Sequence, residues 1–218
     1  MKKNIFNFSN TYSKLPKTFF EKINPSPVKN PKLEQFNFNL SKELDIDPKK
    51  ISGDIGRLIF SGNLIPTGAY PIAMAYAGHQ FGSFVPRLGD GRAILIGELI
   101  SKNGERVDLQ LKGSGRTSFS RGGDGRAALG PMLREYLISE AIHSLNIPTT
   151  RSLAVVKTGE KVVRENLLDG AILTRVASSH IRVGTFQFIA AKQNINNLKT
   201  LVDYTIIINI LNDYCILS

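Results

Sequence analysis

The most regular alternation of hydrophobic and polar residues lies in RVDLQLK, residues 106–112. Its valine and leucines fall on one face of an extended strand, and its polar residues, which end with Lys112, fall on the other. The preceding RAILIGELI, residues 92–100, is also strand-like. Between the two segments, Asn103 and Gly104 accept the positive φ angles of a tight turn. The pattern predicts a β-hairpin that ends in Lys112.

A helical period replaces the alternation after a loop over residues 113–130. Pro131 suits the first turn of a helix, where its missing N–H removes no hydrogen bond. Pro148 lies just beyond the last apolar position. The residues between the two prolines predict one helix with a broad apolar face. The residues of that face are Leu133, Leu137, Ile138, Ala141, Ile142 and Leu145.

The segments that follow predict three more strands and a final helix. The strands are SLAVVK at 152–157, KVVREN at 161–166 and AILTRVA at 171–177. A turn at Thr158 and Gly159 separates the first two. The final helix is expected to start near Asn197. Its apolar continuation is interrupted by aspartates and asparagines, which is typical of a core helix rather than a membrane span.

An antiparallel sheet that carries one main helix is an α+β arrangement, and it differs from the alternating order of a doubly wound sheet. Residues 1–50 precede it with ten lysines, no arginine and five prolines. Prolines at that density prevent long regular elements. We therefore expect an extended basic arm with one short helix near residues 40–45. A solvated leader without a binding role is the plainer interpretation of this arm.

The bulk composition narrows the classes of partner and compartment. The chain has 218 residues and a formal net charge of +10, which favours anionic partners such as nucleic acid, a nucleotide or an acidic surface. A single cysteine, Cys215, excludes an internal disulfide and a zinc site built from thiolates. No apolar run follows the two lysines at the start, so a signal peptide and a membrane partner are not predicted. We expect a cytoplasmic, reducing location. No metal site is predicted either, because the histidines show no ligand spacing: His79, His143 and His180.

A glycine-rich motif, Gly89-Asp90-Gly91-Arg92, stands immediately before the first strand of the predicted hairpin. Glycines let backbone N–H groups approach phosphate oxygens closely. An adjacent arginine adds a bidentate charged contact. The same four residues are also typical of an ordinary turn, so the motif alone leaves both interpretations open.

Lys112 and Glu135 extend this motif. A lysine that projects from a sheet beneath a glycine loop can neutralise phosphate charge, and a carboxylate on the next helix can fix its direction. The alternatives are a solvated lysine and an acid that complements the helix dipole. A glycine loop, a hairpin, a strand lysine and a helix glutamate occur in this order in the nucleotide-binding lobe of protein kinases. The Walker A pattern does not occur in the sequence.

The loop over residues 113–130 is unlike a kinase loop, because it combines many glycines with arginines. Such a backbone can wrap around an anionic ligand, although a solvated basic loop is also open. Arg175 lies in an apolar strand, where burying an arginine without an anionic partner is costly. Arg182 follows it, and surface ion pairs are the alternative for both. The loop arginines are Arg116, Arg121 and Arg126.

Most of residues 60–190 is covered by three segments: YAGHQFGSFVPRLGDGRAILIGE, LQLKGSGRTSFSRGGDGRAALGPMLREYLISEAIHSLNIPTTRSLAVV and ILTRVASSHIRVGTFQF. These segments closely resemble the selenoprotein O family. The similarity is long and nearly free of gaps, so it is specific to that family rather than a coincidence of one motif.

The resemblance implies a protein-kinase-like pseudokinase fold that binds ATP in a flipped orientation with Mg²⁺. Members of the family transfer AMP, rather than phosphate, to Ser, Thr or Tyr hydroxyls of proteins and release pyrophosphate. It also assigns residues 51–190 to the nucleotide-binding lobe and residues 191–218 to the start of a helical second lobe. Glu135 would orient Lys112. The residues that would contact the nucleotide are Gly89, Gly91, Arg92, Lys112, Asp124, Gly125, Arg175 and Arg182.

The family's catalytic aspartate, the neighbouring asparagine and the metal-binding aspartate belong to the second lobe, and we expect them beyond Ser218. The family's C-terminal redox residue is expected there too. The chain would then be a C-terminally truncated member, and a separately encoded C-terminal half is a candidate partner. Three functions stay open: an ATP-dependent protein adenylyltransferase or its nucleotide-binding half, a catalytically dead remnant that at most binds nucleotide, and a basic nucleic-acid-binding protein. The last ranks lowest, because the loop offers only Phe119 for base stacking.

Overall fold

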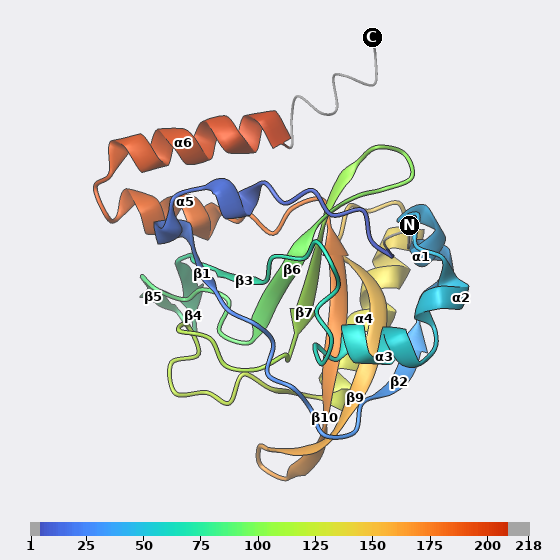
Figure 1. Ribbon diagram of the computed structural model, residues 1–218. Helices are drawn as coiled ribbons and strands as arrows, with labels where there is room; N and C mark the ends of the chain where they lie inside the picture. The colour runs from blue at the N-terminus through green and yellow to red at the C-terminus, as the bar shows by residue number, and fades with distance from the viewer. Residues whose placement is uncertain (1–4, 209–218) are drawn as a thin grey trace.

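One eight-stranded sheet runs through the centre of the computed structural model, which describes residues 5–208 (Figure 1). The strand order is β1-β3-β6-β7-β10-β9-β2, with β8 paired to β10, and β4 and β5 form a separate two-stranded sheet. All of these pairings are antiparallel. The predicted α+β class with an antiparallel sheet is therefore confirmed.

The elements have the following bounds. The strands are β1 (Phe20–Lys22), β2 (Lys32–Phe36), β3 (Ile72–Met74), β4 (Gly78–Gln80), β5 (Ser83–Val85), β6 (Ala93–Ile100), β7 (Arg106–Lys112), β8 (Ala127–Ala128), β9 (Arg151–Val163) and β10 (Leu167–Ala177). The α-helices are α1 (Phe38–Glu43), α2 (Pro48–Ile51), α3 (Asp54–Phe60), α4 (Leu129–Ser144), α5 (Val183–Ala190) and α6 (Ile195–Ile206). Two short 3-10 helices precede them, η1 (Tyr12–Lys14) and η2 (Lys17–Phe19).

Helices cover both faces of the sheet. Successive residues of a strand point to opposite faces, and on β9 the buried Val155 packs with Met132 of α4 while Val156 packs with Ile59 of α3. Figure 1 shows α5 and α6 stacked beside the β3 end of the sheet, and residues of both helices share a hydrophobic cluster with β3. Helices thus pack on both faces of the sheet and beside its β3 end.

The β6–β7 hairpin is confirmed as predicted. Ala93 pairs with Lys112, and the strands remain paired to Ile100 and Arg106. Gly104 in the connecting turn has a φ of 84°, which is the left-handed conformation that the Asn-Gly pair predicts. Lys112 therefore stands at the end of β7, opposite the start of β6.

The prediction of three strands over residues 152–177 is wrong, because β9 and β10 form one long hairpin. Gly159 has a φ of 72°, but the chain passes through it within β9 and reverses only after Val163. A Cβ at Gly159 would lie 2.6 Å from the Cβ of Asn30, so the glycine permits a close approach of the N-terminal segment. The turn falls around Arg164 instead.

The main helix, α4, begins at Leu129 rather than at Pro131, and its broad apolar face does not all pack on the sheet. Met132 and Ser139 are buried, whereas Leu137, Ile138 and Leu145 are 67%, 55% and 70% exposed. The helix buries a narrow line of side chains against β9 and β10. Much of its hydrophobicity therefore faces outward.

Residues 5–50 are not the extended arm that the proline content predicts. The short helix is present as α1, but β1 pairs with β3 and β2 pairs with β9, so this segment supplies both edges of the main sheet. Strands of three and five residues are short enough to fit between the prolines, and neither strand contains one. Hydrophobic residues such as Phe19 are fully buried in the core.

The C-terminal part of the described chain contains one helix that was expected and one that was not. Helix α6 starts at Ile195, close to the predicted Asn197, and its Tyr204 hydroxyl lies 3.1 Å from Oε1 of the buried Glu98. Helix α5 was not predicted. Cys215 and the last apolar residues lie outside the described part of the chain. Within residues 5–208, no helix has both the length and the hydrophobicity that a membrane span requires.

Candidate nucleotide-binding site

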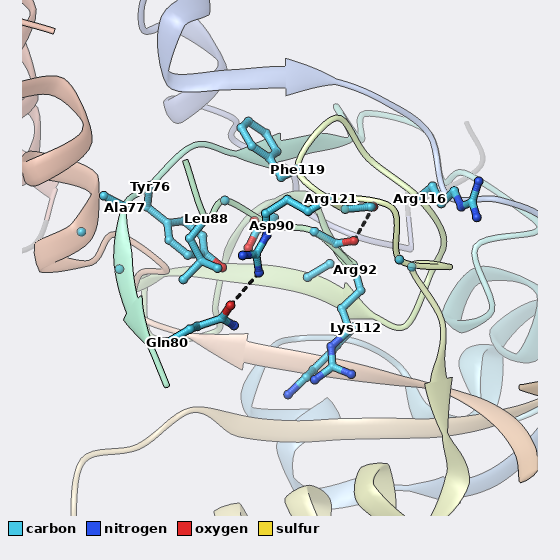
Figure 2. Close-up of a pocket in the computed structure, with 18 of the residues that line it drawn as sticks. Tyr76, Ala77, Gln80, Leu88, Asp90, Arg92, Lys112, Arg116, Phe119 and Arg121 are labelled. Carbon is cyan, nitrogen blue, oxygen red and sulfur yellow. Dashed lines mark hydrogen bonds between the residues drawn. The ribbon is translucent and has the colours of Figure 1, made fainter. Parts of the chain in front are cut away.

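A cavity of about 940 Å³ lies between the glycine-rich loop over residues 113–126, the β4–β5 hairpin and the start of α5. Figure 2 shows Gln80, Asp90, Arg92 and Lys112 around it. The structure brings together at this cavity all the residues that the family resemblance assigns to the nucleotide: Gly89, Gly91, Arg92, Lys112, Asp124, Gly125, Arg175 and Arg182. They come from four separate parts of the chain, so the convergence is a property of the fold.

The lining of the cavity is strongly cationic. Among residues 5–208, two acidic side chains line it, Asp90 and Asp124. A concave wall with one sign of charge concentrates anions and strengthens their binding. The cations of the wall are Arg92, Lys112, Arg116, Arg121, Arg126, Arg164, Arg175 and Arg182.

Lys112 is held by Glu135. Its ammonium group forms a salt bridge with Oε2 of Glu135, and the two side chains are 18% and 29% exposed. Burial lowers the pKa of the Lys112 ammonium, and the hydrogen bond to Glu135 opposes that shift. Oε1 of the same carboxylate lies 3.4 Å from Arg175 Nη1, so Glu135 holds two cations of the cavity wall at once.

Asp90 anchors the floor of the cavity. Its side chain is buried, and Oδ2 accepts hydrogen bonds of 3.1 Å from the backbone N–H of Met74 and from Nε2 of Gln110. Burial raises the pKa of Asp90, and burial together with the nearby Asp90 charge raises the pKa of Tyr76 to about 12. From the sequence, Asp90 stood out only as a member of the Gly89–Arg92 motif, with no role of its own.

Gly89 and Gly91 are needed for close packing. Gly89 has a φ of 57°, and a Cβ there would lie 2.2 Å from Cγ of Phe119. A Cβ on Gly91 would lie 2.7 Å from the backbone oxygen of Phe119. Ser120 Oγ also donates a 2.6 Å hydrogen bond to the Gly91 carbonyl. The turn before β6 is thereby pressed against the glycine-rich loop, and this packing shapes one wall of the cavity.

Asp124 is engaged within the protein. Its carboxylate accepts hydrogen bonds from Arg164 and from the backbone N–H of Arg126, and the bond from Arg164 lowers the pKa of Asp124. Arg164 also donates a 3.0 Å hydrogen bond to the carbonyl of Arg126. Gly125, with a φ of 68°, packs its backbone against Gly115. Asp124 therefore shapes the loop through its own side chain.

Two further contacts border the cavity, and sequence analysis missed both. Arg121 Nη2 donates a 2.6 Å hydrogen bond to Oε1 of Gln80, which ties the loop to the β4–β5 hairpin (Figure 2). The Arg182 guanidinium lies 4.8 Å from the centre of the Tyr76 ring. No periodic pattern in residues 76–85 identified this hairpin, because its strands have only three residues each.

A metal site built from this part of the chain alone is not found. No group of three or more histidine, cysteine, aspartate or glutamate side chains within residues 5–208 could hold an ion. His180 is buried and pairs with Asp108, with its Nδ1 3.1 Å from Oδ2 and its backbone N–H donating to the same oxygen at 2.7 Å. This pair fixes the segment between β10 and α5.

Comparison with known proteins gives this cavity a family context. The model of the family described as "Protein adenylyltransferase SelO" matches residues 3–212. A curated protein nucleotidyltransferase YdiU from Pelagibacter ubique is 65% identical over 201 residues, which cover 92% of this chain and 41% of that protein. Proteins of the same name from Rhodopseudomonas palustris and Anoxybacillus flavithermus are each 61% identical over 201 residues, covering 92% of this chain and 41% and 42% of the relatives.

The chain thus spans about two fifths of the length of the curated relatives that it matches. The match extends over nearly the whole described chain, including the edge strands from the N-terminal segment, the glycine-rich loop and helix α6. The chain therefore belongs to the protein adenylyltransferase SelO family.

Proposed function

We propose that this chain is the kinase-like, nucleotide-binding lobe of an ATP-dependent protein adenylyltransferase. The reaction is transfer of AMP to a Ser, Thr or Tyr hydroxyl of a protein, with release of pyrophosphate. The observation that carries the proposal is the cationic cavity in which the pair Lys112 and Glu135 stands beside Arg175. A triphosphate, with several negative charges close together, matches such a wall.

The residues have distinct roles in this proposal. Lys112 and Arg175 contact phosphate oxygens, and Glu135 holds both cations in place. Arg92 and Arg182 add positive charge to the lining of the cavity. Asp124 and Gly125 keep the glycine-rich loop in the shape that encloses the nucleotide. Electrostatic stabilisation of the pyrophosphate leaving group is the main contribution of this lobe to catalysis.

The residues that complete the reaction belong to a second lobe in the proposed organisation. Residues 5–190 form the nucleotide-binding lobe in this proposal, because β1 and β2 supply the edge strands of its sheet. Helix α6 begins the helical second lobe, to which the family's catalytic aspartate belongs. Mg²⁺, when bound, would neutralise phosphate charge through oxygen ligands. The described residues hold no acidic cluster for it, so we assign its protein ligands to the second lobe. The proposed location is cytoplasmic, with protein substrates as partners.

The second candidate is a remnant that binds nucleotide without catalysis. This candidate applies if catalysis needs residues from the part of the relatives that lies outside the match, which covers 41% of the Pelagibacter ubique protein. A separately encoded C-terminal half would turn such a lobe into an active enzyme. A basic nucleic-acid-binding role ranks last, because the cations line a concave cavity rather than a stripe along the surface.

The proposal is tested with the purified chain, Mg²⁺ and ATP labelled at either the α or the γ phosphate. Retention of the α label on protein, without the γ label, would demonstrate AMP transfer. Reversible binding of both labels would identify a nucleotide-binding lobe. Lys112→Ala should abolish binding, whereas Lys199→Ala, which removes an exposed lysine of α6, should leave it unchanged. Absence of binding by the unmodified chain would refute the proposal, and salt-sensitive binding to random DNA without competition by ATP would favour the nucleic-acid alternative.

A further inference from the structure

Gln110 connects two charged residues of the cavity although it does not itself line the cavity. It lies on β7 two residues before Lys112, and it is fully buried. Its Nε2 donates a 3.1 Å hydrogen bond to Oδ2 of Asp90, and its Oε1 accepts a hydrogen bond from Nη2 of Arg175. One side chain therefore bridges the acid at the cavity floor and the buried cation of the cavity wall.

The orientation of the Gln110 amide is determined by Asp90 and Arg175 together. A guanidinium only donates hydrogen bonds and a carboxylate accepts them, so the amide oxygen of Gln110 faces Arg175 and its nitrogen faces Asp90. Asp90 is itself fixed by the backbone N–H of Met74 at 3.1 Å. If the amide were flipped, its NH2 group would face the N–H donors of the Arg175 guanidinium. Its oxygen would then face the carboxylate oxygen of Asp90. The geometry thus selects a single arrangement.

Arg175 is in turn fixed by two acceptors on different elements. Gln110 on β7 receives Nη2, and Glu135 on α4 lies 3.4 Å from Nη1. The Arg175 side chain is only 14% exposed, so few other directions are open to it. The orientation of the Arg175 guanidinium is therefore determined by two contacts: Gln110, which Asp90 holds, on one side, and Glu135 on the other.

We propose that Gln110 is a positioning residue that directs the Arg175 guanidinium toward the phosphates of the bound nucleotide, and that Asp90 fixes the Gln110 amide for this purpose. The inference rests on the proposed nucleotide-binding function. Gln110 acts through Arg175 and does not touch the ligand. The positioning role makes a specific prediction: substitution of Gln110 should have no further effect on nucleotide binding once Arg175 has been removed.

The test is a double-mutant cycle on the full chain with ATP as the probe. Gln110→Met keeps the size of the side chain and removes both hydrogen bonds, and it should weaken ATP binding by at least about tenfold. In an Arg175→Met background, the same change should have almost no further effect. Ser139→Ala, which removes another buried hydrogen bond away from the cavity, is the matched control and should leave ATP affinity unchanged.

A second set of variants covers the case in which Gln110→Met does not fold. Gln110→Glu places a second carboxylate beside Asp90, where two like charges repel, and should weaken binding. Adding Asp90→Asn should restore ATP affinity to within about threefold of the unmodified chain. In this double exchange the introduced amide can donate to the introduced carboxylate, and that carboxylate still accepts from Arg175.

The outcomes separate the two proposals. Additive losses in the cycle, or a double exchange no better than Gln110→Glu alone, would overturn the positioning role while leaving nucleotide binding intact. An unmodified chain without ATP affinity would overturn the proposed function and the positioning role with it. Coupling in the cycle together with rescue by the double exchange supports the inference.

Discussion

Arg164 donates hydrogen bonds to both carboxylate oxygens of Asp124, at 2.7 and 3.2 Å, and so ties the turn between β9 and β10 to the glycine-rich loop. The two residues are separated by 40 positions in the sequence. A bidentate pair of this kind specifies direction as well as distance. The shape of the cavity therefore depends on the turn of the same hairpin that supplies Arg175 to its wall.

The pH dependence of stability should reveal this pair. The Arg164 hydrogen bond holds the pKa of Asp124 below its ordinary value, so the pair stabilises the folded state above the ordinary aspartate pKa of about 3.9. That contribution is lost as pH falls through the lowered value. We expect Asp124→Asn to reduce the free energy of unfolding at pH 7, and the difference from the unmodified chain to vanish at strongly acid pH. Urea unfolding of both proteins at a series of pH values measures this difference in the free energy of unfolding.

Arg164→Met serves as the companion variant, because it removes the two bonds to Asp124 from the other side, together with the bonds to the backbone carbonyls of Val163 and Arg126. Its destabilisation should become smaller at low pH, where only the part due to the two carbonyls should remain. A destabilisation that stays constant from neutral to acid pH, in either variant, would mean that the pair does not contribute through the charge of Asp124.

ATP binding should depend on alkaline pH through Lys112. Burial lowers the pKa of Lys112, and Glu135 opposes this shift. The charged form binds phosphate, so affinity should fall as pH rises toward a pKa below that of a solvated lysine. Glu135→Gln removes the opposing charge and should move the loss of affinity to lower pH. Titration of ATP binding between neutral and alkaline pH is the measurement.

The matched variant for that titration is Lys112→Arg. Arginine keeps its charge throughout the alkaline range, so the decline attributed to Lys112 should disappear, whatever the affinity at neutral pH. A decline that persists unchanged in Lys112→Arg would assign the pH dependence to a different group.

Arg175→Ala should weaken ATP binding by at least about 1.5 kcal/mol, the scale of a charge-assisted hydrogen bond. The buried guanidinium is replaced by a small side chain, and Glu135 loses one of its two cationic partners. Arg134→Ala removes an exposed arginine from α4 that does not line the cavity, and should leave affinity unchanged. Equal effects of the two substitutions would indicate that only the net charge of the chain matters. Isothermal titration with ATP gives both values.

Gly89→Ala should lower the free energy of unfolding more than an alanine substitution at another glycine that also has a positive φ but has no atoms near the added Cβ. At Gly89 the added Cβ meets the Phe119 ring, and we expect a loss of about 1–3 kcal/mol beyond the backbone strain. Gly104 has a φ of 84° with nothing within 4 Å of an added Cβ, so Gly104→Ala should cost only the strain, about 1–2 kcal/mol. Urea unfolding of both variants is the comparison, and equal losses would contradict the packing role of Gly89.

Local patterns predicted the parts of this fold that depend on neighbouring residues. The β6–β7 hairpin follows from the alternation in residues 106–112 and an Asn-Gly turn. The register shift between Leu95 and Gly97, which sets the pairing of Lys112 with Ala93, does not follow from these patterns. The salt bridge between Lys112 and Glu135 could be predicted, because the helix that carries Glu135 directly follows, after a single loop, the strand that ends in Lys112. The apolar context of its strand singled out Arg175, and the family resemblance assigned Arg175 and Arg182 to the nucleotide, because no periodic pattern connects them to Lys112.

The remainder depends on tertiary structure. Gly159 resembles a turn residue, but the approach of Asn30 makes it part of a continuous strand, and the turn moves to Arg164. The apolar face of α4 is wider than the sheet beneath it, so periodicity overestimated what the helix buries. The N-terminal prolines concealed two edge strands whose partners lie far along the sequence.

Those two edge strands have a consequence for the order in which the chain acquires its structure. Lys32 pairs with Lys157, so a strand made early in synthesis waits for a partner that emerges more than a hundred residues later. Pairings of such large sequence separation slow folding, because the entropy of loop closure is lost before the contacts form. Strand β2 must remain unpaired while the β6–β7 hairpin, α4 and β9 are still being completed, whereas β1 can pair with β3 earlier. The final closure of the sheet at its β2 edge is thus a late kinetic event, and the nascent chain carries its own unpaired edge strand until then.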